Sequence, residues 1–294
     1  MVVVGSLNLD TTARVSRLPR PGETVLGTGH TSDTGGKGAN QAVAAARLGR
    51  PVAMVGRVGN DDAGRQITGV LATEGVDANA VSVDDTTPTG MAFITVDGAG
   101  ENMIVVSPGA NATMSIADIE RAADIIAGAG VLLLQLEIPL EVVHHAAAIC
   151  RGIVVLNPAP AAELSAGLLE AVDILVPNRT ELAVLTGADP AGSSEQIAEQ
   201  VELLPVGAGI VTLGAEGALV RASGQTTHVP APTVTAVDAT AAGDAFCAGL
   251  ADALADGATP LEAARWGVRV GAVTVTRAGA QAALPTRAEV SALS

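Results

Sequence analysis

The chain has 294 residues, which is long enough for one large α/β domain or for two ordinary ones. It carries 31 acidic and 16 basic residues, a formal net charge of −15, so it lacks the basic surface that nucleic acid or an anionic membrane requires. Its two cysteines, Cys150 and Cys247, are too few for a disulfide framework or a zinc site, and we expect both in the core.

The apolar content of 48% raises the question of a membrane protein. However, the longest uncharged apolar stretch, residues 125–136, contains glycines and is shorter than the roughly 20 residues that a membrane-spanning helix needs. The chain begins without a basic segment, so we expect no signal peptide. These features favour a cytoplasmic protein with no membrane partner.

Short β-branched runs alternate with amphipathic helical patterns along most of the chain. Buried strands are predicted at residues 2–4, 52–55, 131–136, 153–156, 174–176 and 209–213. Helices are predicted at 38–48, 61–74, 115–127, 140–150, 161–171, 180–186, 195–204, 244–255, 260–276 and 286–292, with an edge hairpin at 218–220 and 227–229. This alternation predicts an α/β fold with a parallel sheet that is covered on both faces.

Two segments interrupt that alternation. Residues 11–35 are polar and rich in turn residues, and residues 89–107 alternate in the manner of a hairpin with a glycine-rich turn at 98–100. We expect both to form strands of a small second sheet outside the main one. Such a sheet is either a flap over a cleft or an edge hairpin without moving parts.

Polar residues follow several predicted strands. In open parallel sheets, ligands bind beyond the carboxyl ends of the strands, so these positions are candidates for a binding site. Helix capping or turn formation would explain each of them singly. Together they predict one polar edge of the sheet: Asn8, Asp10, Glu137, Asn157, Asn178, Glu181, Thr212 and Gly214.

The turn at residues 35–40, G-G-K-G-A-N, is rich in glycine and leads into a helix. It does not match the phosphate-binding P-loop, and the chain has no G-x-G-x-x-G after its first strand, which disfavours a dinucleotide oxidoreductase. The glycines allow the backbone to approach a ligand closely, and Asn40 offers both a donor and an acceptor. With Asn8, Asp10 and Glu137, this turn predicts a pocket for a sugar.

The most informative segment is 238–250, D-A-T-A-A-G-D-A-F-C-A-G-L. The small residues Ala241, Ala242 and Gly243 lead into a helix, and the amides at a helix N-terminus attract anions such as phosphate. Asp244 in the first turn either complements the helix dipole or acts as a base beside a phosphoryl group.

Eight motifs in this order resemble those of the ribokinase family of carbohydrate kinases (phosphofructokinase-B type), from one end of the chain to the other. They are G-S-L-N-L-D at 5–10, G-G-K-G-A-N-Q-A at 35–42, Q-L-E-I-P at 135–139, N-P-A-P-A at 157–161, P-N-R-T-E at 177–181, V-T-L-G at 211–214, A-T-A-A-G-D-A-F at 239–246 and R-A-G-A-Q at 277–281. The resemblance implies a three-layer α/β/α Rossmann-like domain over residues 1–294, with a β lid formed by about 11–35 and 88–108. In this family two lids often associate to form a homodimer.

The resemblance also implies roles for individual residues. Asp244 is expected to be the catalytic base, with Ala241, Ala242 and Gly243 forming the anion hole. Sugar-binding positions are Asn8, Asp10, Gly36, Lys37, Asn40, Glu137 and Asp244. Nucleotide-binding positions are Asn178, Thr212, Gly214, Gly217 and Gly243. Glu181 is expected to bind Mg²⁺ through water, and Asp238, Thr240, Thr274 and Gly279 to form a site for a monovalent cation such as K⁺.

The chain departs from the family pattern at three positions. Ala239 replaces the usual Thr of the signature, and Ala241 stands where many relatives have Gly. Ala283 stands where a hydroxyl residue often completes the potassium site, which leaves the strength of potassium activation open.

Three hypotheses for the function follow. The first is an enzyme that transfers the γ-phosphoryl group of ATP to the 5-hydroxyl of D-ribose, with Mg²⁺ and an activating K⁺. The second is a sister kinase for 2-deoxyribose, another sugar or a nucleoside. The third is a non-catalytic sugar or nucleotide sensor, which the intact Asp244 and glycine-rich loop disfavour.

Overall fold

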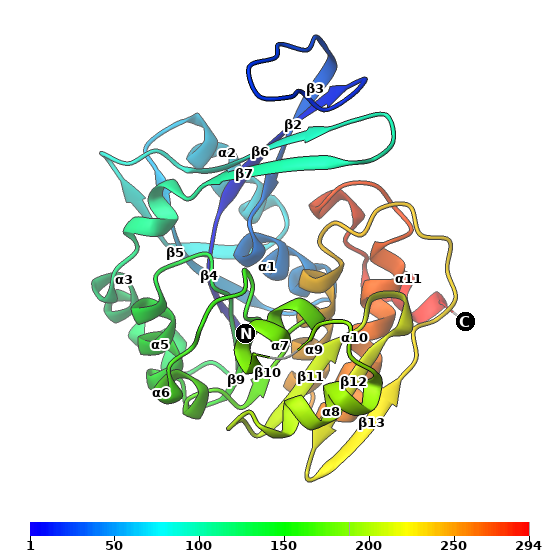
Figure 1. The fold of residues 1–294 in the computed structure, drawn as a ribbon. Coiled ribbons are helices and arrows are strands. Elements are labelled where there is room, and N and C mark those ends of the chain that lie inside the picture. Colours follow the sequence, from blue (N-terminus) through cyan, green and yellow to red (C-terminus); the bar gives the residue numbers. More distant parts are fainter. Residues whose placement is uncertain (188, 294) are drawn as a thin grey trace.

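A computed structural model describes residues 1–187 and 189–293 of the chain. Its main element is a nine-stranded sheet in the order β13-β12-β11-β10-β9-β8-β1-β4-β5 (Figure 1). The strands are β1 (Val2–Val4), β4 (Val52–Gly59), β5 (Val76–Asp84), β8 (Val131–Leu134), β9 (Ile153–Leu156), β10 (Ile174–Leu175), β11 (Ala208–Thr212), β12 (Ala218–Ala222) and β13 (Gln225–Val229). All neighbours are parallel except the hairpin β12–β13 and its pairing with β11.

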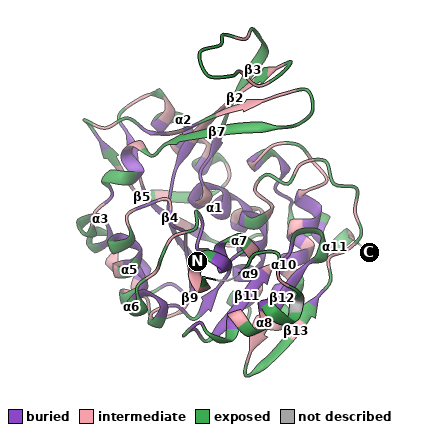
Figure 2. Ribbon diagram, viewed as in Figure 1, coloured by how far each residue is buried: buried purple, intermediate pink, exposed green. Residues whose placement is uncertain are grey.

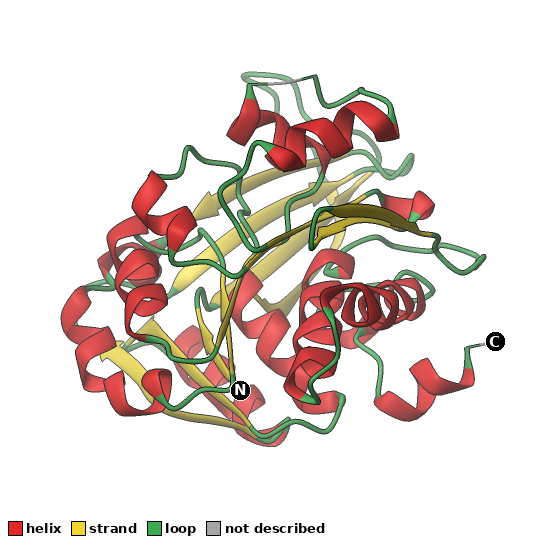
Figure 3. Ribbon diagram, turned by 90° about the horizontal axis from the view of Figure 1, so that it is seen from below, coloured by secondary structure: helices red, strands yellow, loops and turns green. Residues whose placement is uncertain are grey.

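Helices cover both faces of this sheet, as Figure 3 shows. One face packs against α1 (Lys37–Arg47), α2 (Asp62–Thr73), α9 (Ala242–Ala255), α10 (Pro260–Thr274) and α11 (Arg287–Ala292). The other packs against α3 (Ile116–Arg121), α4 (Ala123–Ala127), α5 (Leu140–Ile149), α6 (Ala166–Glu170), α7 (Arg179–Thr186) and α8 (Ser194–Glu202). Alternate strand residues enter opposite cores: Val3 faces the first set of helices, whereas Val2 and Val4 face the second. The expected three-layer α/β/α fold is confirmed.

A four-stranded sheet extends from one end of the main body (Figure 1). Its strands are β2 (Asn8–Val15), β3 (Gly27–Gly35), β6 (Gly90–Val96) and β7 (Asn102–Ser107), in the order β3-β2-β6-β7. We call it the small sheet. Much of it is exposed (Figure 2), and all six residues of β7 are. It contains the segments that broke the strand–helix alternation of the sequence, and it begins at Asn8, three residues before the expected boundary.

Three other elements differ from the sequence-based predictions. The edge strand β5 was not predicted, because its sequence V-D-A-N-A-V-S-V-D contains Asp and Asn, which are depleted in strands. The predicted helix 161–171 is confined to Ala166–Glu170, where Ser165 caps it. The predicted helix 115–127 is two short helices that meet at Ala122.

Short 3₁₀ segments complete the architecture: η1 (Gly109–Thr113), η2 (Gly214–Glu216) and η3 (Gln281–Ala283). Among the residues that the model describes, none of the helices is both long and apolar enough to cross a membrane.

Candidate active site

Asp244 lies in the first turn of α9, and only 5% of its surface is exposed. Two amides of α1 hold its carboxylate: Nδ2 of Asn40 donates to Oδ2 at 3.0 Å, and Nε2 of Gln41 donates to Oδ1 at 3.1 Å. Burial raises the pKa of Asp244, although nearby Lys37 and these two donors favour the charged form. The site therefore contains an oriented carboxylate with raised basicity.

Gln41 is positioned in turn by residues from the central strands. Nε2 of Gln135 donates to Oε1 of Gln41 at 2.6 Å, and Nε2 of Gln41 also lies 3.5 Å from Oδ1 of Asn157. The sequence-based list of site residues missed both glutamines. They lie within the motifs at 35–42 and 135–139, but neither motif alone reveals that their side chains converge on Asp244.

The N-terminus of α9 is open toward solvent. Ala241 precedes it in the left-handed conformation, with φ 59°, and the first helical bond runs from the amide of Ala245 to the carbonyl of Ala241 at 2.8 Å. The amides of Gly243 and Asp244 precede that bond and point out of the helix. The amide of Ala242 donates to the carbonyl of Ala239 at 3.2 Å. The positive end of the helix is thus available to an anion, chiefly through Gly243 and Asp244.

Gly243 has no packing reason to be a glycine, because a Cβ placed there would meet no described protein atom within 4 Å. A glycine at this position leaves the adjacent amides open to a ligand. In front of it lies a pocket of about 230 Å³. The pocket is lined by Lys37, Asn157, Ala159, Val176, Asn178, Glu181, Thr212, Ala239, Ala241, Gly243, Asp244 and Cys247.

Asn178 and Glu181 line the pocket from the start of α7. They make a reciprocal capping box at the start of α7, in which the Glu181 carboxylate accepts from the amide and Nδ2 of Asn178, both at 2.8 Å. Burial raises the pKa of Glu181, and Lys37 opposes that shift. Lys37 is the only cationic side chain among the lining residues, so bound phosphates would need a further cation for charge balance.

The expected sugar residues include Glu137 and Asp10, whose charges act on Asp244 or are affected by it. Oε2 of Glu137 accepts from the amide of Lys37 at 3.0 Å and from Oγ of Ser6 at 2.5 Å. Asp10, on β2, has its Oδ1 buried with no partner among the described residues. Burial, followed by the charges of Glu137, Asp33 and Asp244, raises the pKa of Asp10 to about 6.

Both glycines of the turn at 35–36 are closely surrounded, Gly35 by a side chain and Gly36 by backbone. A Cβ on Gly35 would lie 2.0 Å from Oδ2 of Asp10, and one on Gly36, which has φ +87°, would lie 2.9 Å from the amide of Asn8. Oδ1 of Asn40 is a second buried acceptor without a partner in the described chain. Two unpaired acceptors, Asp10 Oδ1 and Asn40 Oδ1, suit a ligand that donates hydroxyl hydrogens.

The residues predicted to bind a nucleotide are only partly together. Asn178, Thr212 and Gly243 line the pocket, and an isolated parallel bridge joins Asn178 to Thr212. Gly214 and Gly217 lie in the connection between β11 and β12. A Cβ on Gly217 would lie 2.0 Å from the carbonyl of Val229, so packing against β13 already requires that glycine.

Asp238 joins two loops beside the anion-accessible helix end. Its Oδ1 accepts from the amide and hydroxyl of Thr240, at 2.9 and 2.6 Å, and its Oδ2 accepts from the amide of Gly279 at 2.9 Å. The hydroxyl of buried Thr274 donates to the carbonyl of Val270 within α10. Buried Ala283 supplies no side-chain oxygen. In residues 1–187 and 189–293, no three His, Cys, Asp or Glu side chains gather as a metal site.

Comparison with known proteins agrees with this geometry. Residues 1–287 match the family model described as "pfkB family carbohydrate kinase". The chain is 42% identical to a ribokinase of Haemophilus influenzae over 98% of this chain and 96% of that protein. It is 38% identical to a deoxyribokinase of Salmonella typhi, over 97% of this chain and 95% of that protein.

A solved structure of similar fold is Arabidopsis thaliana ribokinase complexed with ribose and ATP. It has a TM-score of 0.91 and 34% identity, and the match covers 99% of this chain and 97% of that one. Both the family model and the relatives span nearly the whole chain, including every residue of the pocket. The protein therefore belongs to the pfkB family of carbohydrate kinases.

Proposed function

We propose that this protein is a ribose 5-kinase, which transfers the γ-phosphoryl group of ATP to the 5-hydroxyl of D-ribose. The observation that carries the proposal is the position of the Asp244 carboxylate. It lines the pocket at the N-terminus of α9, accepts a hydrogen bond from Asn40, and is close enough to Glu137 and Asp10 for their charges to interact. A base in that position can take a proton from a sugar hydroxyl while the hydroxyl oxygen attacks a phosphorus atom in the pocket.

The surrounding groups have complementary roles in this proposal. Asn40 and Gln41 hold the carboxylate, and its raised pKa makes it a better proton acceptor. The amides of Gly243 and Asp244, together with the Lys37 ammonium, would stabilise the charge on the transferred phosphoryl group. The buried acceptors Asp10 Oδ1 and Asn40 Oδ1 would bind sugar hydroxyls.

Two cations belong to the proposal. Glu181 and Asn178 fit a water-mediated Mg²⁺ site, because they border a pocket with one cationic side chain. When bound, Mg²⁺ would neutralise charge on the ATP phosphates. Asp238 fits a K⁺ site that stiffens the helix end, since it already holds Thr240 and Gly279 together. In that site Thr274 and Gly279 would contribute their backbone carbonyls.

The small sheet is proposed to be a lid over the sugar, in which Asp10 of β2 contacts the substrate. Closure would exclude water and so suppress hydrolysis of ATP. We further propose that the small sheets of two chains associate, because Phe93, Met103 and Val105 are large, apolar and about half exposed or more on this sheet.

The alternative substrate is 2-deoxyribose, favoured by the similarity to a deoxyribokinase. A site that hydrogen-bonds the 2-hydroxyl rejects the analogue that lacks it, because buried polar groups are then left unpaired. The deciding assay measures ATP-dependent phosphorylation of ribose, 2-deoxyribose, fructose and a nucleoside. A clear preference for ribose in kcat/KM supports the proposal, and a preference for any of the others contradicts it.

The catalytic assignment is tested with Asp244→Asn, which keeps the size of the side chain and removes the base. We expect kcat to fall by about 10²–10⁴-fold while affinity for the sugar is retained, as for the loss of a general base. Asp256→Asn is the matched control, because Asp256 is exposed at the other end of α9, and we expect near-normal turnover. Near-normal turnover in Asp244→Asn would overturn the assignment.

A further inference from the structure

Asn111 holds the start of the small sheet through a set of hydrogen bonds that mimics strand pairing. It lies in η1, directly after β7, and is 1% exposed. Its Oδ1 accepts from the amide of Leu7 at 2.9 Å, and its Nδ2 donates to the carbonyl of Leu7 at 3.1 Å. The same Nδ2 donates to Oδ1 of Asn8 at 2.8 Å.

These contacts determine which way the Asn8 side chain faces. A backbone amide can only donate and a carbonyl can only accept, so Leu7 fixes the orientation of the Asn111 amide. Because Nδ2 of Asn111 is a donor, the atom of Asn8 that meets it must be the oxygen Oδ1. The backbone N–H and C=O of Leu7 thus determine, through Asn111, how a side chain of the proposed sugar site is oriented. Asn8 retains Nδ2 with both hydrogens, for which residues 1–187 and 189–293 supply no acceptor.

The contact is tightly enclosed. Gly90, the first residue of β6, pairs with Asn8, and a Cβ on Gly90 would lie 2.3 Å from both Nδ2 of Asn111 and Oδ1 of Asn8. The pair of side chains leaves no space for a Cβ at position 90. A glycine at position 90 is therefore required by this side-chain pair.

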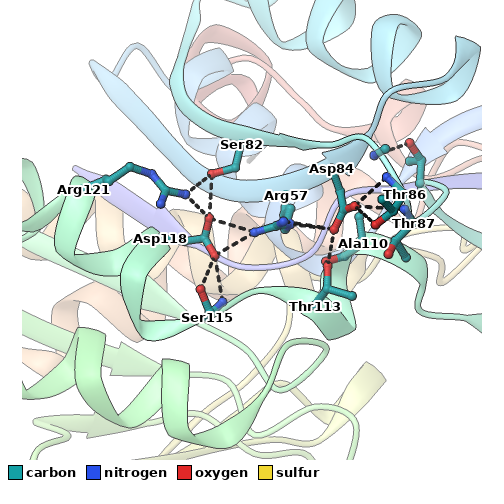
Figure 4. Close-up of polar contacts among 12 residues, drawn as sticks. Arg57, Ser82, Asp84, Thr86, Thr87, Ala110, Thr113, Ser115, Asp118 and Arg121 are labelled. Atoms are coloured by element: carbon teal, nitrogen blue, oxygen red, sulfur yellow. Dashed lines mark hydrogen bonds and ion pairs between the residues drawn. The ribbon is translucent and has the colours of Figure 1, made fainter.

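A charged network holds η1 itself to the main sheet (Figure 4). The hydroxyl of Thr113 donates to Oδ2 of Asp84 at 2.9 Å, and Nε of Arg57 donates to the same oxygen at 3.1 Å. Arg57 also pairs with buried Asp118 at 3.1 Å. Asp84 and Arg57 lie on β5 and β4, so the helical turn that contains Asn111 is tied to the main sheet rather than to the exposed part of the small sheet.

We propose that Asn111 is a positioning residue of the sugar site, which orients the Asn8 amide so that its Nδ2 faces the substrate. Asn8 then supplies donors beside Asp10 and Glu137, which accept. A sugar hydroxyl can donate its hydrogen to one of these carboxylates and at the same time accept a hydrogen bond from Nδ2 of Asn8. The site therefore offers both kinds of partner that a polyol needs. The inference rests on the proposed function, because it takes Asn8 to contact the sugar.

Asn111→Asp is the direct test. The new carboxylate can still accept from the amide of Leu7, but it can donate neither to the carbonyl of Leu7 nor to Asn8, whose amide would then turn to present its oxygen to the sugar. We expect the KM for the sugar to rise about tenfold or more, with kcat and the KM for ATP changed little. In an Asn8→Ala background the same substitution should leave the sugar KM unchanged, since Asn111 acts through Asn8.

Thr113→Val is the control for a purely structural effect, because it loosens η1 from Asp84 without touching Asn8. We expect it to lower the melting temperature through the loss of one hydrogen bond, and to leave the sugar KM within about twofold because Thr113 does not contact Asn8. A sugar KM that rises equally in Thr113→Val, or equally in the presence and absence of Asn8, would contradict the positioning role.

Asn8→Asp tests the orientation without altering Asn111, in case Asn111→Asp does not fold. The free end of the side chain becomes an acceptor, so we expect it to weaken sugar binding at least as much as Asn8→Ala. Sugar affinity close to that of the wild type would overturn the inference. All variants are assayed with the sugar that the wild type phosphorylates best. Failure of the ribose proposal appears as an inactive wild type with ribose, whereas failure of the inference appears only in the variants.

Discussion

Asp10 shows how the proposed sugar site opposes the stability of the fold. Its half-buried carboxylate lies near the charges of Glu137, Asp33 and Asp244, and its pKa is raised to about 6 from an ordinary 3.8. The folded protein therefore binds this proton more tightly than the unfolded chain does. Stability from this group is fully present below pH about 4 and is lost as the pH rises through about 6.

We expect Asp10→Asn to increase the free energy of unfolding at pH 7, by up to about 3 kcal/mol if the whole shift is realised. The variant should also show a flatter dependence of stability on pH between about 4 and 6, while its KM for ribose rises because one accepting oxygen is replaced by an NH2 donor. Urea unfolding at several pH values and sugar kinetics measure both effects. Asp33→Asn, at the exposed position opposite Asp10 on β3, is the control and should change stability less. A less stable Asp10→Asn variant at pH 7 would contradict this account.

At the scale of elements, the proposed chemistry depends on how α1 and α9 pack. Each begins at a tight turn with a positive φ, at Gly36 and Ala241. The left-handed conformation of Ala241 costs about 1 kcal/mol for a residue with a Cβ, and it directs the first amides of α9 toward the pocket. The loop that holds Gly279 braces this end of α9 through Asp238.

That brace gives a prediction for the monovalent cation. We expect activity to rise when Na⁺ is replaced by K⁺ at constant ionic strength, because a bound K⁺ would stiffen the Asp238 loops. Asp238→Asn should lose most of this difference, since it weakens the carboxylate that joins Thr240 to Gly279. Initial rates in matched chloride salts test the point. Equal rates of the wild type in both salts would rule out the cation role.

At the scale of the whole molecule, the small sheet exposes large apolar side chains that nothing in the same chain covers among the described residues. Phe93 and Val105 are cross-strand partners on β6 and β7, and they are 47% and 64% exposed. Exposed apolar groups of this kind mark an interaction surface or a region that closes. Association of two small sheets would bury them and would stabilise the proposed lid.

We expect the wild type to be a dimer in solution and Val105→Lys to shift it toward the monomer, because the ammonium would be buried without a partner. Light scattering coupled to size exclusion measures the mass. Leu203→Lys is the matched control, since Leu203 is 74% exposed at the end of α8 and away from the small sheet. A monomeric wild type, or a Val105→Lys variant that remains a dimer, would refute the proposed interface.

Much of the main fold could be predicted from sequence because its signals are local. Runs such as Val2–Val4 and Ile153–Leu156 are buried on both faces, so they are continuously apolar and easily recognised. Strand β5 was not predicted because an edge strand retains polar residues. Only its pairing with β4 identifies it as a strand. The helix expected at 161–171 was predicted too long. Its composition favours a helix throughout, but the helix begins only after Ser165, which caps it.

The site residues likewise fall into those that local sequence motifs indicate and those that only tertiary packing brings together. Motif spacing pointed to Asp244, Asn40, Glu137 and the glycine turns, because loops and helix starts impose particular residue types on consecutive positions. Gln41, Gln135 and Asn111 could not be assigned in this way. Their partners lie 203, 94 and 104 positions away in the chain, so their hydrogen bonds exist only after the helices and strands have packed.

The sequence by itself determined the α/β class, the family resemblance and the residue types of the site, because each depends on periodicity or on short-range turn geometry. The tertiary structure decided the orientation of those residues: which amides hold Asp244, which end of Asn8 is free and which carboxylates are crowded enough to shift a pKa. The physical reason is that hydrogen-bond direction and desolvation depend on neighbours that the chain brings together only on folding.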